Sequence, residues 1–177
     1  IHDIENQIRA AKIHDVDSLV RVRRGSYSDH TLPLEMDAAG IMVPHVMSLA
    51  DAKELVYHTC FHPIGRRGLD GGNSDGDYCR IPLLDYMQQA NEQRFIMIQV
   101  EDPEVVDDLE EIVKLPGIDM VLFGAGDFSQ AIGDPGNFDN PEIQKVYKYI
   151  PEVTRKHGKF CGALANATNY DKLLNLG

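Results

Sequence analysis

The stretch FIMIQVED, residues 95–102, decides how the fold is interpreted. It begins with an almost continuous apolar run, which is typical of a strand buried on both faces of a parallel sheet. The run then ends in two acids, Glu101 and Asp102. In parallel α/β folds the residues just past the C-terminal ends of the strands form the active-site face, because the loops vary there while the sheet holds them. The stretch therefore predicts a buried strand that brings a carboxylate to a functional site.

Similar apolar runs recur along the chain, and amphipathic stretches separate them. The expected strands cover residues 18–22, 40–44, 95–100, 119–124 and 160–164. Between them, residues 48–58 and 102–115 have helical patterns, and the first opens with Ser48 and Asp51 at capping-box spacing. Strands that alternate with helices predict an α/β domain in which helices cover a parallel sheet. We expect residues 1–177 to form one domain.

Composition limits the classes of function. The chain has 177 residues, of which 43% are hydrophobic, as in an ordinary globular domain. Its 28 acidic and 17 basic residues give a net charge of −11. This charge repels the phosphates of nucleic acids and anionic membrane surfaces. We therefore expect neither nucleic acid nor a membrane as a partner.

The cysteines and the apolar runs indicate a location. Cys60, Cys79 and Cys161 are odd in number, widely spaced and without a C-x-x-C pair, so they indicate neither a disulfide framework nor a zinc site. No apolar run approaches the roughly 18 residues that a membrane-spanning helix needs. The first residues lack a signal-peptide pattern. We expect reduced thiols in a cytoplasmic protein.

Two carboxylates are expected to meet at one end of the sheet. Glu101 follows one candidate strand, and Asp127 follows the next, 26 positions later. Facing carboxylates repel each other unless a cation lies between them. Oxygen ligands without cysteine or histidine at ligand spacing favour Mg²⁺ or Mn²⁺ over zinc. The alternative is structural, with Glu101 capping a helix that begins at Pro103 and Asp127 capping one that begins at Phe128.

Arg21 and the glycines of FGAGD are further candidates. Arg21 interrupts an apolar run near a strand end, and a buried arginine needs an anion. That anion is either a structural acid or a substrate carboxylate or oxyanion. The amides of Gly126 and Asp127 could hold a carboxylate at a helix N-terminus. Separately, residues 63–81 form a long glycine-rich loop that is either functional or a disordered excursion.

Taken together, these motifs resemble the metal-dependent pyruvate aldolases of the HpcH/HpaI family. The motifs that carry the resemblance occur in the family's order: LVRV, GIMVPHV, HPIGRRG, YMQQANE, IQVEDPE, LPGIDMVLFGAGDFS, PGNFDNPE and HGKFCG. The resemblance implies a TIM (β/α)8 barrel of the phosphoenolpyruvate/pyruvate superfamily. Such barrels typically need about 250 residues, so we expect a single partial barrel with about five of the eight strands.

The resemblance also implies roles for individual residues. Glu101 and Asp127 would bind the metal, Gln99 would line the pyruvate site, and Arg21 would contact the keto or enolate oxygen. Gly126 and the amide of Asp127 would receive the pyruvate carboxylate. The implied reaction is cleavage of a 4-hydroxy-2-oxo acid to pyruvate and an aldehyde, in which the metal stabilises the pyruvate enolate.

The base that deprotonates the 4-hydroxyl is not identified. His45 follows a strand end, but the family places its relay histidine in a segment with no counterpart before Ile1, which favours a structural role for His45. We expect the natural protein to extend beyond Ile1 and Gly177 and to be a homo-oligomer, a hexamer by resemblance. Two alternatives remain: an acyl-CoA lyase, with Arg66 and Arg67 as the candidate CoA-phosphate site, and a non-catalytic relative that keeps the fold.

Overall fold

The structure, a computed structural model, describes residues 2–176. The strands are β1 (Leu19–Arg21), β2 (Gly40–Val43), β3 (Phe95–Val100), β4 (Met120–Phe123) and β5 (Phe160–Ala163). The α-helices are α1 (His2–Ile13), α2 (Tyr27–Glu35), α3 (Leu49–Thr59), α4 (Leu83–Gln93), α5 (Leu109–Val113), α6 (Ala125–Ala131), α7 (Pro141–Lys156) and α8 (Tyr170–Leu176). Short 3₁₀ helices are η1 (Ser74–Gly76) and η2 (Pro103–Asp108). All five expected strands are present.

The strands form one parallel sheet in the order β1-β2-β3-β4-β5. Ile98 of β3, for example, pairs with Val43 on one side and Val121 on the other. Each strand lies beside its neighbours in the sequence, which is the winding of a (β/α)8 barrel and not of a doubly wound sheet. Within residues 2–176 the sheet does not close, because β1 and β5 are its two edges. The fold is therefore an arc of five barrel strands, as expected.

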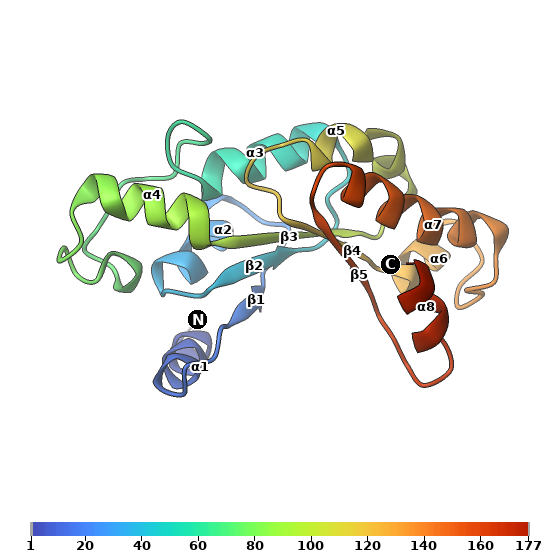
Figure 1. Cartoon of the computed structure of the whole chain (residues 1–177), viewed down its shortest axis with the longest axis horizontal. Helices are drawn as coiled ribbons and strands as arrows, with labels where there is room; N and C mark the ends of the chain where they lie inside the picture. Colours follow the sequence, from blue (N-terminus) through green and yellow to red (C-terminus); the bar gives the residue numbers. More distant parts are fainter. Residues whose placement is uncertain (1, 177) are drawn as a thin grey trace.

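Helices cover one side of the sheet and bury the central strands. In Figure 1, α3, α5 and α7 lie side by side across it, while α1 and α8 lie near its two edges. Ile98 and Val100 of β3 have no exposed surface, and neither do Leu109 and Ile112 of the covering layer. This burial explains why β3 is an uninterrupted apolar run in the sequence. None of the helices within residues 2–176 is long and apolar enough to cross a membrane.

Of the two helices expected at residues 48–58 and 102–115, the first forms as one helix and the second is divided. The Ser48 side chain accepts a hydrogen bond from the Asp51 amide at 3.2 Å, as the capping-box spacing predicts. Residues 102–115 instead divide into η2 and the short α5. The Asp108 carboxylate lies at their junction and accepts a hydrogen bond from the Leu49 amide at 2.8 Å. This tertiary bond ties the junction to the start of α3.

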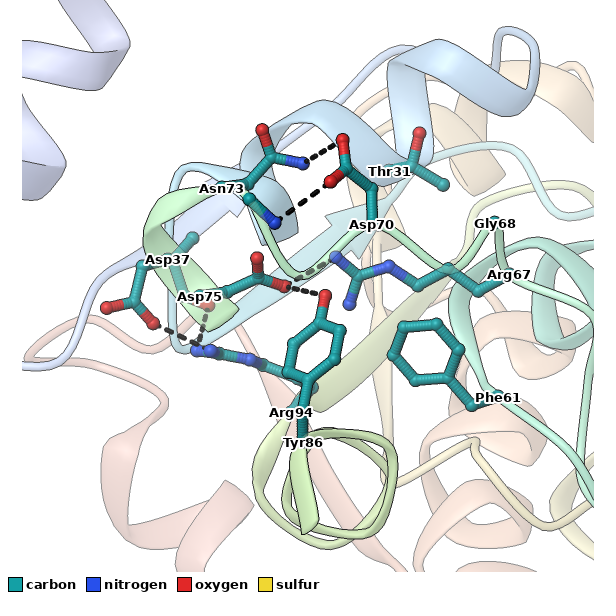
Figure 2. Close-up of polar contacts among 12 residues, drawn as sticks. Thr31, Asp37, Phe61, Arg67, Gly68, Asp70, Asn73, Asp75, Tyr86 and Arg94 are labelled. Atoms are coloured by element: carbon teal, nitrogen blue, oxygen red, sulfur yellow. Dashed lines mark hydrogen bonds and ion pairs between the residues drawn. The ribbon is translucent and has the colours of Figure 1, made fainter. Parts of the chain in front are cut away.

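A buried polar network holds the long loop of residues 63–81. Figure 2 shows the Arg67 guanidinium pointing at the Asp75 carboxylate, 2.5 Å away, with neither side chain exposed. The Tyr86 hydroxyl donates to the same carboxylate at 2.8 Å, and burial raises the pKa of this phenol. Arg67 also stacks over the ring of Phe61, 4.9 Å from its centroid. The loop is therefore anchored in the fold and is not a disordered excursion.

The network lies at the end of the sheet opposite Glu101. Asp75 and Tyr86 line a cavity of about 350 Å³ together with Arg94, which immediately precedes β3. Arg94 forms an ion pair with Asp37 at 2.6 Å, as Figure 2 also shows. Glu101 follows β3 at its other end. This network therefore supports the fold from the N-terminal end of β3.

Candidate functional site

The C-terminal ends of β1 to β4 bring the predicted site residues together. Arg21 ends β1, Glu101 follows β3, and Asp127 lies just after β4. Because these strands are parallel neighbours, their C-terminal ends lie at the same end of the sheet. His45, two residues after β2, lies at the same end of the sheet.

A chain of hydrogen bonds links Arg21 to Glu101 through Gln99. The Arg21 Nε–H donates to Gln99 Oε1 at 2.9 Å, and Gln99 Nε2–H donates to Glu101 Oε1 at 2.8 Å. Gln99 is buried, whereas Arg21 is exposed and not buried as the sequence suggested. The hydrogen bond to the neutral Gln99 amide thus orients the Arg21 guanidinium. Its guanidinium remains available to an anion at the rim of the site.

Glu101 is a buried carboxylate whose hydrogen-bond donors are neutral. Only 2% of the residue is exposed, and its Oε2 accepts the backbone N–H of His45 at 3.1 Å. The structural alternative for Glu101 is wrong, because Asp102 occupies the N-cap position of η2 while the Glu101 side chain turns toward Gln99 and His45. A buried carboxylate with this environment favours a nearby cation.

Asp127 joins Glu101 from the first turn of α6. This helix begins at Ala125 with Gly124 as its N-cap, so Asp127 lies inside the helix and does not cap one that begins at Phe128. Ligand atoms of His45, Glu101 and Asp127 lie within 4.8 Å of one another. These are two carboxylates and one imidazole, a set that fits a divalent cation. His45 was not expected among the ligands, because no local spacing connects it to the two acids.

Gly124 is a second residue that sequence reasoning missed. A Cβ on Gly124 would lie 2.4 Å from Glu101 Cγ, whereas a Cβ on Gly126 would meet nothing within 4 Å. The glycine that the packing of the site requires is therefore Gly124. The FGAGD motif pointed to this turn but could not distinguish its two glycines.

A cavity of about 220 Å³ lies beside His45 at this end of the sheet. Its polar lining includes Arg24, paired with Asp51 at 2.9 Å, and His30. His30 Nε2–H donates to the Arg24 carbonyl at 3.0 Å, which leaves the buried Nδ1 without a hydrogen-bond partner. Burial lowers the pKa of this imidazole, so the neutral form is favoured.

The comparison with protein families agrees with this geometry. Residues 1–175 match the sequence profile of the HpcH/HpaI aldolase/citrate lyase family. The chain belongs to this family. A 2-keto-3-deoxy-L-rhamnonate aldolase of Salmonella gallinarum is 31% identical over 93% of the chain. The chain spans 61% of the length of that relative.

Two solved structures share the fold. The citrate synthase SbnG is 31% identical, with a TM-score of 0.85 over 98% of this chain and 67% of the SbnG chain. An HpcH/HpaI aldolase from Desulfitobacterium hafniense is 26% identical, with a TM-score of 0.89 over 99% of this chain and 68% of its own. The five-stranded arc therefore corresponds to part of a larger HpcH/HpaI fold.

Proposed function

We propose that this HpcH/HpaI chain carries the metal and 2-oxo-acid site of an aldolase that cleaves 4-hydroxy-2-oxo acids to pyruvate and an aldehyde. The observation that carries the proposal is the approach of Glu101 and Asp127, within 4.8 Å, beside the hydrogen-bonded pair of Gln99 and Arg21. The relatives that are named as aldolases support the reaction class.

Glu101 and Asp127 would hold a divalent cation, Mg²⁺ or Mn²⁺. When bound, the cation supplies Lewis-acid stabilisation of the negative charge that develops on the 2-oxo acid. Gln99 keeps Glu101 Oε1 in a defined orientation through its amide N–H, and it also orients Arg21. Arg21 would share the developing charge on the keto oxygen through its remaining N–H groups.

The first turn of α6 would bind the substrate carboxylate. Backbone N–H groups in a first helical turn have no partner within the helix. Those of Gly126 and Asp127 lie in this turn, and the position of Gly126 is open to solvent. A carboxylate held there would lie next to Asp127 and therefore close to the cation. The carboxylate and the keto oxygen of the 2-oxo acid would then both lie beside the cation.

The structure weakens the acyl-CoA alternative. Arg67, one of two candidate contacts for CoA phosphates, has no exposed side-chain surface and pairs with Asp75. A phosphate would have to displace that buried ion pair, which is costly. Arg66 alone remains exposed.

A pyruvate-formation assay on the full-length protein tests the proposal. We expect turnover with added Mg²⁺ or Mn²⁺ and none after chelation. Glu101→Gln and Asp127→Asn should both abolish metal-dependent turnover with the fold retained. Glu104→Gln, an exposed acid on the same segment, is the matched control and should behave like the unmodified protein. Normal turnover in either site variant contradicts the proposal, and a folded protein that binds metal without turnover indicates a non-catalytic relative.

We also propose a cytoplasmic homo-oligomer, a hexamer by family resemblance. Light scattering on the purified full-length protein measures its mass directly. A monomeric mass contradicts this part of the proposal.

A further inference from the structure

The Ser129 hydroxyl joins two parts of the chain. Ser129 lies in α6, two residues after Asp127, and has no exposed surface. Its Oγ–H donates to the Gly126 carbonyl at 2.6 Å. The same Oγ accepts the backbone N–H of Gly136 at 2.9 Å, from the α6–α7 segment of residues 132–140. One buried hydroxyl therefore bridges the first turn of α6 and the segment that follows this helix.

The two bonds of the hydroxyl fix its direction. A serine hydroxyl has one proton to donate and lone pairs that accept. The Gly136 N–H only donates and the Gly126 carbonyl only accepts, so the hydroxyl proton lies on the side of Gly126. Hydrogen bonds in such a chain polarise and strengthen one another. The bridge is therefore more than the local bond that a serine commonly makes to a carbonyl of its own helix.

The bridge acts on the peptide unit that joins Gly126 to Asp127. The Gly126 carbonyl and the Asp127 N–H belong to one planar unit, so a hydrogen bond to the carbonyl restrains both residues. Gly126 is exposed, and a Cβ at this position would meet nothing within 4 Å. Glycine is a poor helix former, and helix ends fray. Ser129 thus supplies a restraint that side-chain packing at Gly126 does not supply.

Asp134 holds the α6–α7 segment in the conformation that presents the Gly136 N–H. Its Oδ2 accepts hydrogen bonds from Asn137 Nδ2 and Asn140 Nδ2, both at 2.8 Å. Its backbone N–H donates to the Ser129 carbonyl at 2.9 Å. Gly136 has φ of +80°, a left-handed conformation that glycine adopts readily. The segment is therefore a structured turn that is tied to Ser129 through both its backbone and its hydroxyl.

We propose that Ser129 is a positioning residue which, together with the α6–α7 segment, holds the first turn of α6 so that the Asp127 carboxylate stays within reach of Glu101. The inference rests on the proposed function and adds a residue that lies outside its ligand set. Ligand atoms of the two acids lie within 4.8 Å of each other, and ionised carboxylates at that distance repel. Because Asp127 is exposed, a loose first turn would let this repulsion move it away before a cation binds.

Ser129→Ala removes the bridge, and Thr154→Val is the matched control. The Thr154 hydroxyl is equally buried and donates to the Ile150 carbonyl at 2.7 Å within α7. Both variants lose a buried hydroxyl bond to a helical carbonyl, so a general loss of stability affects both. Amide hydrogen exchange of the metal-free, full-length protein reports on the turn itself. We expect exchange in α6 to become about 2- to 10-fold faster in Ser129→Ala and to stay unchanged in Thr154→Val.

Calorimetric titration with Mn²⁺ and with Mg²⁺ after chelation gives the second readout. We expect Ser129→Ala to weaken the binding of both ions by about 10-fold, as when a group that orients a ligand is lost, and Thr154→Val to bind like the unmodified protein. Asp134→Ala releases the α6–α7 segment with Ser129 in place and should weaken binding by a smaller factor. Asp139→Ala removes an exposed charge from the same segment and should leave the affinity unchanged.

The outcomes separate the inference from the proposed function. Equal metal affinities in Ser129→Ala and Thr154→Val, or unchanged exchange in α6, overturn the inference and leave the metal site intact. Equal losses in Asp134→Ala and Asp139→Ala show an effect of charge and also overturn it. If Ser129→Ala does not fold, the comparison of these two variants decides the inference. Failure of the unmodified protein to bind either ion overturns both the inference and the proposed function.

Discussion

Arg67 and Asp75 form an ion pair that solvent does not reach, with 2.5 Å between Nη2 and Oδ2 and no exposed surface on either side chain. Residues 63–81 thereby fold back onto α4, where Tyr86 donates to the same carboxylate. Removing one partner of a buried pair leaves an uncompensated charge, which typically costs about 3–5 kcal/mol.

The first prediction follows from that pair. Asp75→Asn should lower the free energy of unfolding by about 3–5 kcal/mol, because the Arg67 charge stays buried without a counter-ion. Urea denaturation followed by circular dichroism measures the change. Asp77→Asn is the matched control, since the Asp77 side chain is half exposed and asparagine tolerates its left-handed backbone. A change below about 1 kcal/mol in Asp75→Asn would show that the pair is not an anchor of the fold.

The second prediction concerns the packing of Gly124 against Glu101. Gly124→Ala places a methyl group 2.4 Å from Glu101 Cγ, so the Glu101 side chain must leave its present position. We expect Mn²⁺ affinity to fall by about 10-fold or more, as for the loss of a partner that orients a ligand. Calorimetric titration measures it. Gly126→Ala meets no atom within 4 Å and should keep the affinity of the unmodified protein. Equal affinities in the two variants contradict the packing argument.

The third prediction separates charge from geometry at Arg21. Arg21→Lys keeps the positive charge but loses the planar guanidinium and the Nε–H bond to Gln99. We expect kcat for pyruvate formation to fall by about 100-fold, the order seen when one oxyanion donor is removed. Arg23→Lys, exposed on the same segment, is the control. If both variants turn over normally, Arg21 is a structural residue only.

The fourth prediction is a pH dependence of stability caused by His30. Burial holds the folded-state pKa of this imidazole below its ordinary value of 6.5. Below pH 6.5 the unfolded chain therefore binds a proton that the folded protein resists, and the unfolded state gains stability. The contribution of His30 to the free energy of unfolding is fully present above the pKa that the imidazole has in the unfolded chain. It is lost as the pH falls below that pKa.

Denaturation between pH 5 and pH 8 measures the slope, within the range where histidine titrates. His30→Gln should flatten it, because glutamine does not titrate. His14→Gln alters an exposed histidine and should leave the slope unchanged. The prediction is wrong if His30→Gln and the unmodified protein lose stability in parallel on acidification.

Much of the site follows from the sequence alone. The apolar run of β3 and the acid after it predict a buried parallel strand with Glu101 at its C-terminal end, and the next strand predicts Asp127 beside it. These inferences succeed because strand periodicity is local, and because consecutive parallel strands with helical crossovers commonly lie side by side. The resemblance to the HpcH/HpaI family rests on the same stretches and agrees with the match over residues 1–175.

The tertiary structure alone decided the other contacts. Asp102 meets His45 because β2 and β3 pair in one register and because the chain after β2 turns through a left-handed residue. Gly124 was distinguished from Gly126 only by the position of the Glu101 side chain. Arg67 could not be separated from Arg66 by sequence, although one is buried and the other exposed. Local patterns determine the elements and their order, whereas contacts between elements depend on register, backbone handedness and packing, which no short stretch encodes.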